Sequence, residues 1–195
     1  MNNAGQQLLL ATRRGDEPAA RSLWHAYAPR LIAYARSIVR RTGTPQDAED
    51  IVQTVFCRML RADLDDLALV DDVGAWLAQV TRRTSLNWLR TNRRERARRG
   101  RAHPASSGDA AAPSDAELAD AIERLPARLR EVVVLKHAGG LTFDQIELAT
   151  GVSRNTAAAR YRAAVERLRS MLRDRDVSSV SFNAKSPREK LVHHG

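Results

Sequence analysis

The sequence predicts an all-α protein made of two small helical modules that a flexible linker joins. Strand signals are nearly absent, because no stretch alternates steadily between polar and apolar residues and aromatic residues make up only 5% of the chain. Capping residues instead precede several stretches in which apolar residues recur at helical spacing. Between these stretches lies GRAHPASSGDAAAPSDA, residues 100–116, which is rich in alanine, serine, glycine and proline. Such a composition is typical of a flexible linker.

This linker sets the domain boundaries. We expect a first domain of about four helices over residues 1–99, a linker over 100–113 and a second domain of about four helices over 114–173. The second domain begins with Ser114 and Glu117 at the spacing of a capping box. The tail, residues 174–195, has neither an apolar period nor caps, so we expect it to be disordered.

The segment TPQDAEDIVQTVFCRML predicts a helix that begins after Thr44. Thr44 suits the N-cap and Pro45 the first helical position, while Asp47 falls in the first turn, where a carboxylate stabilises the helix dipole. The apolar residues on one side, which we expect to be buried, are Ala48, Ile51, Val52, Val55, Phe56, Met59 and Leu60. The other side carries Asp47, Asp50, Gln53, Thr54 and Arg58. Helix physics alone explains this side as a solvated acidic face.

The segment LTFDQIELATGVSRNTAAARYRAAVERLR predicts a helix-turn-helix in the second module. Thr142 and Gln145 form a capping box, Gly151 suits the left-handed conformation that ends a helix, and Ser153 suits the next N-cap. A longer helix then runs to about Arg173. Two helices that meet across such a turn are the usual DNA-reading pair.

The longer helix of this pair has one apolar side and one side suited to DNA. We expect the core to include Ala157, Tyr161, Ala164, Val165, Leu168 and Leu172. The opposite side carries Asn155, Ala158, Ala159, Arg162, Glu166 and Arg169. Residues 152–175 hold seven arginines against Glu166 and Asp174, a net charge of +5, which favours a DNA contact over a merely solvated face.

Individual residues on this helix suit different parts of a DNA groove. Ala158 and Ala159 are small enough to let the helix approach closely and touch thymine methyl groups. Asn155 and Arg162 suit hydrogen bonds to base edges. Arg154 and Thr156, near the helix N-terminus, are better placed for phosphates.

Charge is segregated along the chain, which has a formal charge of +9 and a pI near 10.8. Residues 44–72 hold eight acidic residues against Arg58 and Arg61, whereas residues 82–101 hold nine arginines against Glu95. One surface is therefore expected to repel DNA and the next to attract it. The basic excess points to nucleic acid as the first class of partner and to an anionic membrane surface as the second.

The sequence favours a cytoplasmic protein without membrane insertion. No apolar run approaches the roughly 18 residues needed to span a bilayer, and the N-terminus lacks a signal-peptide pattern. The lone cysteine, Cys57, cannot form an internal disulfide, which fits a reducing compartment. A redox switch at Cys57 is the less favoured interpretation, because no second thiol is available.

We expect no metal, no cofactor and no catalytic centre. The histidines have no cysteine partners at metal-binding spacing; they are His25, His103, His137, His193 and His194. No phosphate-binding loop is present in the sequence either. Trp76 and Trp88 could stack on unpaired bases, but their spacing puts them about 120° apart on one helix, so we expect at least one in the core.

The order of these motifs resembles bacterial RNA polymerase sigma factors. AEDIVQTVF is followed by an acidic loop, by AWLAQVTRRTSLNWLRTNRRERARR, by the linker, by LPARLREVVVLKHAGGLTFDQI and by the helix-turn-helix. The chain is most similar to the extracytoplasmic-function (ECF) group of the sigma-70 family, which keeps only regions 2 and 4. The resemblance covers about residues 18–173. It implies a promoter-recognition subunit that directs polymerase to −35 and −10 elements and supports promoter melting.

The resemblance also implies partners and contact residues. Core polymerase, through its largest-subunit clamp helices and its flap, is expected to bind this chain, with docking residues Asp47, Asp50, Gln53 and Thr54. The acidic loop from Asp63 to Gly74 matches the part that captures a flipped −10 base. Single-stranded −10 DNA is expected to contact Trp76, Arg82, Arg83, Asn87, Arg90 and Arg93. The −35 element is expected to contact Ser153, Arg154, Asn155, Thr156, Ala158, Ala159, Arg160 and Arg162. An anti-sigma protein is a further partner that the resemblance allows.

Four positions depart from the family's pattern. Arg83 stands where many relatives have asparagine, which leaves the captured base open. Ala158 and Ala159 stand where lysine or arginine is common, so the −35 sequence does not transfer. Glu147 occupies a helix-turn-helix position usually filled by a small residue, and we expect its charge to point outward or to pair with the next helix.

Two other function classes explain fewer of these features. A free-standing transcriptional regulator accounts for the helix-turn-helix but leaves the acidic face and the two-module plan unused. A DNA-processing enzyme, such as a recombinase, would need a nucleophile in an organised cluster, and the sequence supplies none.

Overall fold

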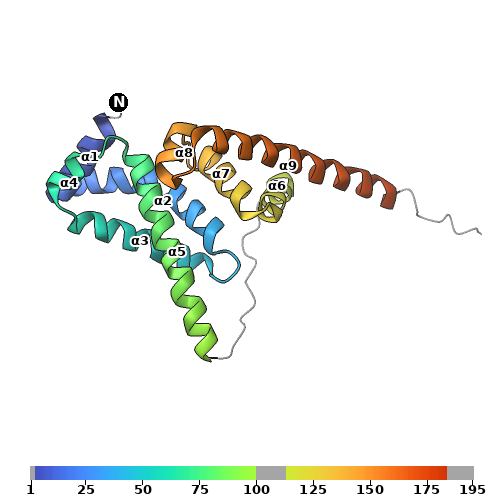
Figure 1. The fold of residues 1–195 in the computed structure, drawn as a ribbon, viewed down its shortest axis with the longest axis horizontal. Coiled ribbons are helices and arrows are strands. Elements are labelled where there is room, and N and C mark those ends of the chain that lie inside the picture. The colour runs from blue at the N-terminus through green and yellow to red at the C-terminus, as the bar shows by residue number, and fades with distance from the viewer. Residues whose placement is uncertain (1–2, 100–112, 184–195) are drawn as a thin grey trace, which may run out of the picture.

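Helices make up every regular element in the part of the chain that the structure describes. The computed structural model describes residues 3–99 and 113–183, and the linker and tail predictions for 100–112 and 184–195 lie outside the described residues. Within these ranges the helices are α1 (Asn3–Arg13), α2 (Glu17–Val39), α3 (Pro45–Arg61), α4 (Leu64–Ala68), α5 (Val73–Arg99), α6 (Pro113–Arg124), α7 (Ala127–His137), α8 (Phe143–Thr150) and α9 (Arg154–Asn183). The predicted all-α fold class is confirmed (Figure 1).

Helices α1 to α5 form the N-terminal module, and the start predicted for α3 is confirmed. The helix begins at Pro45, the Asp47 N–H donates to Thr44 Oγ1, and the Thr44 N–H donates to the Asp47 carboxylate at 2.6 Å. The apolar stripe of α3 is buried except at Leu60, which is 46% exposed. Leu60 lies at the edge of the stripe in the last turn, where a side chain has neighbours on fewer sides.

The N-terminal module has five described helices rather than the four expected, because the acidic loop contains the short α4. Asp63 caps this helix, since its Oδ1 accepts a hydrogen bond from the Asp65 N–H at 3.0 Å. Leu67 anchors the helix in the core at 1% exposure. A cap and one buried leucine are therefore enough to order one turn within the loop.

Helices α6 to α9 form the C-terminal module, whose helix-turn-helix is confirmed. The Gln145 N–H donates to Thr142 Oγ1 at 3.2 Å, and the Thr142 N–H donates to Gln145 Oε1 at 2.7 Å. Gly151 has φ of 73°, the left-handed conformation that glycine adopts most easily. The α9 helix starts directly after Ser153.

The apolar side of α9 faces inward as predicted. Ala157, Ala164 and Leu168 are buried, and Tyr161 and Leu172 pack on the same apolar clusters from partly buried positions. Val165, the remaining residue predicted for the core, is half-buried. The opposite side is therefore left for contacts outside the module.

Two helix boundaries differ from the prediction. The α6 helix begins at Pro113, so Ser114 lies inside the first turn rather than at the N-cap; proline suits that first position. The α9 helix continues to Asn183 instead of ending near Arg173, so the first part of the tail predicted to be disordered is helical. Nothing between these residues terminates the helix, because the segment contains neither glycine nor proline.

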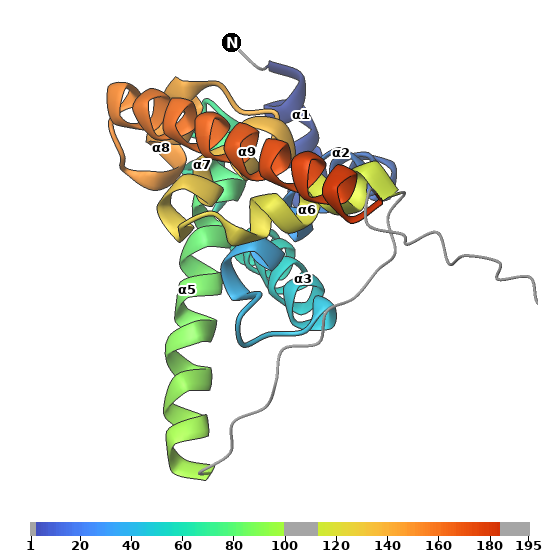
Figure 2. The ribbon, with the colours of Figure 1, turned by 90° about the vertical axis from the view of Figure 1, so that its right-hand side faces the viewer.

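Two long helices extend beyond the packed helices. The C-terminal half of α5 points away from the rest of the molecule in both ribbon views (Figures 1 and 2), and α9 extends past α6 in another direction (Figure 1). Arg90, Arg93 and Arg94 on α5 are exposed. These three arginines are thus open to a partner.

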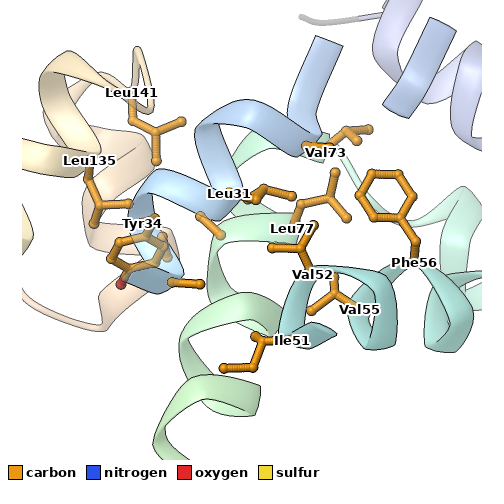
Figure 3. Close-up of a cluster of buried hydrophobic side chains, with 14 of the residues drawn as sticks. Leu31, Tyr34, Ile51, Val52, Val55, Phe56, Val73, Leu77, Leu135 and Leu141 are labelled. Carbon is orange, nitrogen blue, oxygen red and sulfur yellow. The ribbon is translucent and has the colours of Figure 1, made fainter. Parts of the chain in front are cut away.

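The two modules share one apolar core. Leu31 and Leu77 of the N-terminal module belong to the same buried cluster as Leu135 and Leu141 of the C-terminal module. Leu135 and Leu141 lie on the side of α2 that carries Tyr34 and Leu31 (Figure 3). The modules therefore pack directly against each other, and we call this the closed arrangement.

Arg130 is a buried cation that ties the modules together. Its Nε donates to the Ser37 carbonyl of α2 at 3.2 Å, and its Nη1 donates to the carbonyls of Glu123 and Leu125 at 3.0 Å each. Burial lowers the pKa of Arg130, and the positive charge of Arg40 lowers it further. These carbonyls are the acceptors that make a buried guanidinium tolerable.

Replacing Arg130 with methionine is expected to lower the free energy of unfolding by about 2 to 4 kcal/mol, because each buried acceptor left unsatisfied costs about 1 to 3 kcal/mol. Urea titration followed by circular dichroism measures the change. The matched control is Arg128→Met on the exposed side of the same helix, for which we expect a change within about 0.5 kcal/mol. Equal midpoints for the two variants would contradict the structural role of Arg130.

Candidate nucleic-acid interface

The outer side of α3 presents a polar surface with a mixed composition. Asp50, Gln53 and Thr54 are exposed on it, and Cys57 is exposed beside them. The Thr54 hydroxyl donates to the Asp50 carbonyl at 2.8 Å, so its donor is used within the helix. The Asp47 carboxylate is also occupied, because it accepts from both the N–H and the hydroxyl of Thr44. Asp50 Oδ1 also accepts from Gln46 Nε2 at 3.1 Å, so Gln53 is the predicted docking side chain with the most freedom to bind a partner, followed by Asp50 through its second carboxylate oxygen.

The acidic loop between α3 and α5 is exposed over much of its length. Asp65, Asp66 and Asp71 are exposed, whereas Asp72 is half-buried. Asp72 Oδ1 accepts from the Ala75 N–H at 2.8 Å at the start of α5. Its Oδ2 accepts a hydrogen bond from Gln145 of α8. The end of this loop therefore contacts the helix-turn-helix.

The predicted strand-binding residues on α5 are not equally available. Arg83, Asn87, Arg90 and Arg93 are exposed, and Arg90 Nη1 donates to Asn87 Oδ1 at 2.9 Å. Arg82 is half-buried and faces the C-terminal module. The structure thus brings four of the predicted polar residues onto one open surface and leaves Arg82 apart.

Both predicted tryptophans of α5 are half-buried against the apolar core. A Cβ added at Gly43 would lie 3.0 Å from Trp88 Cη2, so the Trp88 ring packs closely on the loop between α2 and α3. The expectation that at least one of Trp76 and Trp88 belongs to the core is confirmed.

Arg82 belongs to a hydrogen-bonded network across the module contact. Its Nε donates to Glu131 Oε1 at 2.8 Å, and the Tyr34 hydroxyl donates to the same oxygen at 2.9 Å. Burial raises the pKa of Tyr34 well above its ordinary value, and the charge of Glu131 adds to this. Burial lowers the pKa of Arg82, but the hydrogen bond and charge of Glu131 outweigh it. The network thus pairs the Arg82 cation with the Glu131 anion at the contact between the modules.

The outward side of α9 combines small and basic residues. Asn155, Thr156, Ala159 and Arg162 are exposed, while Ala158 and Arg160 are half-buried. Ser153 lies at the helix start, where its Oγ is 3.4 Å from the Thr156 N–H. The side chains expected at base edges therefore lie together on one accessible face.

Glu147 pairs with the next helix, as expected, but through the backbone. Its Oε2 accepts from the Arg154 N–H at 2.8 Å. The Arg154 guanidinium instead lies near Asp144, with Nε 3.5 Å from Oδ1. Arg154, which was expected to bind phosphate, is thus close to two carboxylates.

The described residues offer no other obvious chemistry. They contain no group of three or more histidine, cysteine, aspartate or glutamate side chains placed to hold a metal ion. Within the same residues no helix is long and apolar enough to cross a membrane.

Sequence reasoning missed the residues at the module contact. Glu131, Tyr34 and Arg130 stand out only once the modules are packed together. A charged residue on a helix usually indicates a solvated position. The single hint was the concentration of charges in LREVVVLK, which has no strictly polar side.

Comparison with known families gives two matches along the chain. The model of Sigma-70 region 2 matches residues 23–95, and the model of Sigma-70, region 4 matches residues 115–168. The first range lies in the N-terminal module and the second in the C-terminal module.

Curated relatives agree with this result. The RNA polymerase sigma factor CarQ of Myxococcus xanthus is 28% identical over 166 residues, which are 82% of this chain and 92% of the relative. The RNA polymerase sigma-E factor of Streptomyces avermitilis is 31% identical over 151 residues, 75% of this chain and 83% of the relative. The ECF RNA polymerase sigma factor RpoE of Cereibacter sphaeroides is 27% identical over 160 residues, 79% of this chain and 86% of the relative.

Solved structures share the fold. The sigma factor RpoE in complex with the anti-sigma factor NepR from Bartonella quintana has a TM-score of 0.66 and 23% identity, covering 78% of this chain and 96% of that one. CnrH in complex with the cytosolic domain of CnrY has a TM-score of 0.61 and 21% identity, covering 88% and 98%. With regions 2 and 4 in order on two helical modules, the chain belongs to the ECF group of the sigma-70 family of RNA polymerase sigma factors.

Proposed function

We propose that this chain binds core RNA polymerase, directs it to promoters by −35 and −10 recognition and supports strand opening. The observation that carries the proposal is the match of region 2 and region 4, in order, to modules with separate acidic and arginine-rich surfaces. The chain performs no catalytic step of its own, since sigma factors bind DNA and polymerase. It acts in the cytoplasm, where transcription takes place in bacteria.

The contact residues divide by partner. The α3 surface with Asp50, Gln53 and Thr54, beside the capped Asp47, meets the clamp helices of the largest subunit; the flap is assigned to the C-terminal module. The exposed arginines of α5 hold the melted −10 strand through its phosphates, and a flipped base enters beside the acidic loop. The outward side of α9 reads the −35 element in the major groove. An anti-sigma protein is a further proposed partner, supported by the RpoE neighbour that was solved with one.

Promoter binding should depend on core polymerase. The full-length chain alone is expected to bind duplex DNA weakly and with little sequence preference, whereas the complex with core polymerase reaches about 10⁻⁸ M or tighter on specific sites. A gel-shift titration at about 0.15 M salt, near physiological ionic strength, measures both affinities. The probes are duplexes selected from a random library by the complex, and permanganate reports unpaired thymines. Nanomolar, sequence-specific binding by the chain alone, without strand opening, would instead favour a free-standing regulator.

The double substitution Asp50→Arg with Gln53→Arg should abolish copurification with core polymerase. Both side chains are exposed and off the buried stripe of α3, so the helical content should not change. The control makes the same two kinds of replacement at exposed positions elsewhere: Glu117→Arg replaces an acidic side chain, and Gln7→Arg replaces an amide. If polymerase still copurifies with the first variant, the docking surface lies on another face.

The closed arrangement occupies groups that this function assigns to DNA. The Arg82 guanidinium is bound to Glu131, and Asp72 of the acidic loop is bound to Gln145. A strand competes with Glu131 for the Arg82 guanidinium, so full −10 binding is favoured when the modules separate. Arg40 of α2 also pairs with Glu123 of α6 at 2.9 Å, and separation must break this contact too. Polymerase docking supplies the energy for this opening, because an open chain can engage both surfaces at once.

Glu131→Lys should open the chain and raise its affinity for single-stranded DNA. Lysine would face the Arg82 guanidinium, and like charges repel. While most molecules are closed, every roughly 1.4 kcal/mol by which the substitution destabilises the closed form relative to the open form raises the apparent affinity for oligothymidine by up to about tenfold. Fluorescence anisotropy measures binding, and small-angle scattering measures the expected expansion.

The control for this substitution is Glu117→Lys, which adds the same charge at an exposed position of α6. It should leave the scattering curve unchanged and raise the affinity much less. An unchanged radius of gyration in Glu131→Lys, with helical content intact, would show that Glu131 does not hold the modules together.

A further inference from the structure

The start of the reading helix α9 is capped by a residue of the preceding helix. Arg154 is the first residue of α9, and a helix has no internal acceptor for the N–H groups of its first turn. The Arg154 N–H donates to Glu147 Oε2 at 2.8 Å, and Glu147 lies on α8. This hydrogen bond crosses the turn at Gly151 and fixes how α9 starts relative to α8.

A second carboxylate lies at the same helix end. Asp144 is one turn before Glu147 on α8, and its Oδ1 lies 3.5 Å from Arg154 Nε. The first turn of α9 itself contains no acidic residue. Both negative charges that complement the α9 dipole therefore come from α8, across the turn.

We infer that Glu147 is a positioning residue for DNA reading, which holds the N-terminus of α9 and takes the place of a DNA phosphate there. The inference rests on the proposed function, because it treats α9 as the −35 reading helix. The N-terminus of a helix attracts phosphate through its free N–H groups and its partial positive charge. Here the Glu147 carboxylate already uses the first N–H, and Asp144 offsets the charge of Arg154.

The consequence concerns the balance between sequence-independent and sequence-dependent binding. A phosphate contact strengthens binding to every duplex equally and carries no sequence information. With this end of α9 occupied by carboxylates, less of the affinity comes from such a contact. A larger share then comes from exposed side chains further along the helix, Arg162 among them. Glu147 thereby favours discrimination between sites over tight binding to any site.

Two substitutions separate the charge of Glu147 from its hydrogen bond. Glu147→Gln keeps an oxygen acceptor for the Arg154 N–H and removes the charge, whereas Glu147→Ala removes both. Glu147→Gln should bind a random-sequence duplex about two- to fivefold more tightly at low salt, the range expected for one charge at a helix end. The amide oxygen still caps the Arg154 N–H, but no carboxylate at position 147 then repels a phosphate from the other N–H groups of the first turn and from the Arg154 guanidinium. The slope of log K against log salt should therefore steepen by about 0.9, the value of one added phosphate contact.

The hydrogen bond is tested without DNA. Amide hydrogen exchange of Arg154, followed by NMR on the full chain, should be faster in Glu147→Ala than in the wild type and close to wild type in Glu147→Gln. Glu117→Gln removes one negative charge at an exposed position of α6 and is the matched control. It should change neither the salt slope nor the exchange rate.

The outcomes distinguish this inference from the proposed function. Unchanged Arg154 exchange in Glu147→Ala overturns the capping role, whatever the protein does with DNA. Normal capping with the same salt slope in Glu147→Gln and in Glu117→Gln overturns the phosphate-replacing role. Failure of the wild-type chain to bind promoters together with core polymerase would refute the proposed function, while the exchange experiment would still decide on the cap.

Discussion

The closed arrangement depends on the Glu131 carboxylate, which must accept hydrogen bonds from donors on the opposite module. Glu131 lies on α7, but Tyr34 and Arg82, its donors, lie on α2 and α5. A largely buried charge without partners costs several kcal/mol, so α7 can dock only where both donors reach it. Apolar contacts between Leu135 and the α2 side tolerate some sliding, because they have no preferred direction. The apolar core thus provides the attraction, and Glu131 fixes the register.

The separation of charge on the N-terminal module follows from how its helices pack. The apolar stripe of α3 is buried in the same cluster as Leu77 and Ala78 of α5, so the polar sides of the two helices must point in different directions. Acidic residues gather on one side and arginines on the other without neutralising each other. Where the helices do meet through a polar group, a neutral hydroxyl is used: Arg58 Nη1 donates to Thr84 Oγ1 at 3.1 Å. One packed module can therefore meet a protein and a nucleic acid on separate faces.

Features set by neighbours in the sequence could be predicted. The caps at Thr44 and Thr142 and the left-handed Gly151 depend on residues within one turn, and the structure confirms them. The prediction that α9 ends near Arg173 was wrong, because the loss of an apolar period marks the end of packing and not the end of a helix. Docking and DNA contacts remain predictions, since they depend on partners.

Features set by contacts between distant segments could not be predicted in the same way. Arg82 is one of several arginines on α5, and nothing in the neighbouring sequence distinguishes it from the exposed ones. Its partner Glu131 is far away in the sequence, and only the packed modules bring the two together. Arg130 likewise becomes a buried residue through carbonyls on α2 and α6 that the sequence pattern does not reveal.

Because both modules belong to one chain, their contact is an intramolecular equilibrium that dilution cannot shift. Its strength is the intrinsic affinity of the two faces multiplied by an effective concentration, which depends on the length of the segment that links them. Doubling the length of a tether weakens loop closure by only about 0.6 kcal/mol. Breaking a fully buried ion pair by removing one partner costs several times more, on the order of 3 to 5 kcal/mol, and the half-buried pair of Arg82 and Glu131 lies between these two values. The length of the segment between the modules therefore matters little to the closed arrangement, whereas the chemistry at positions 34, 82 and 131 governs how readily the protein opens.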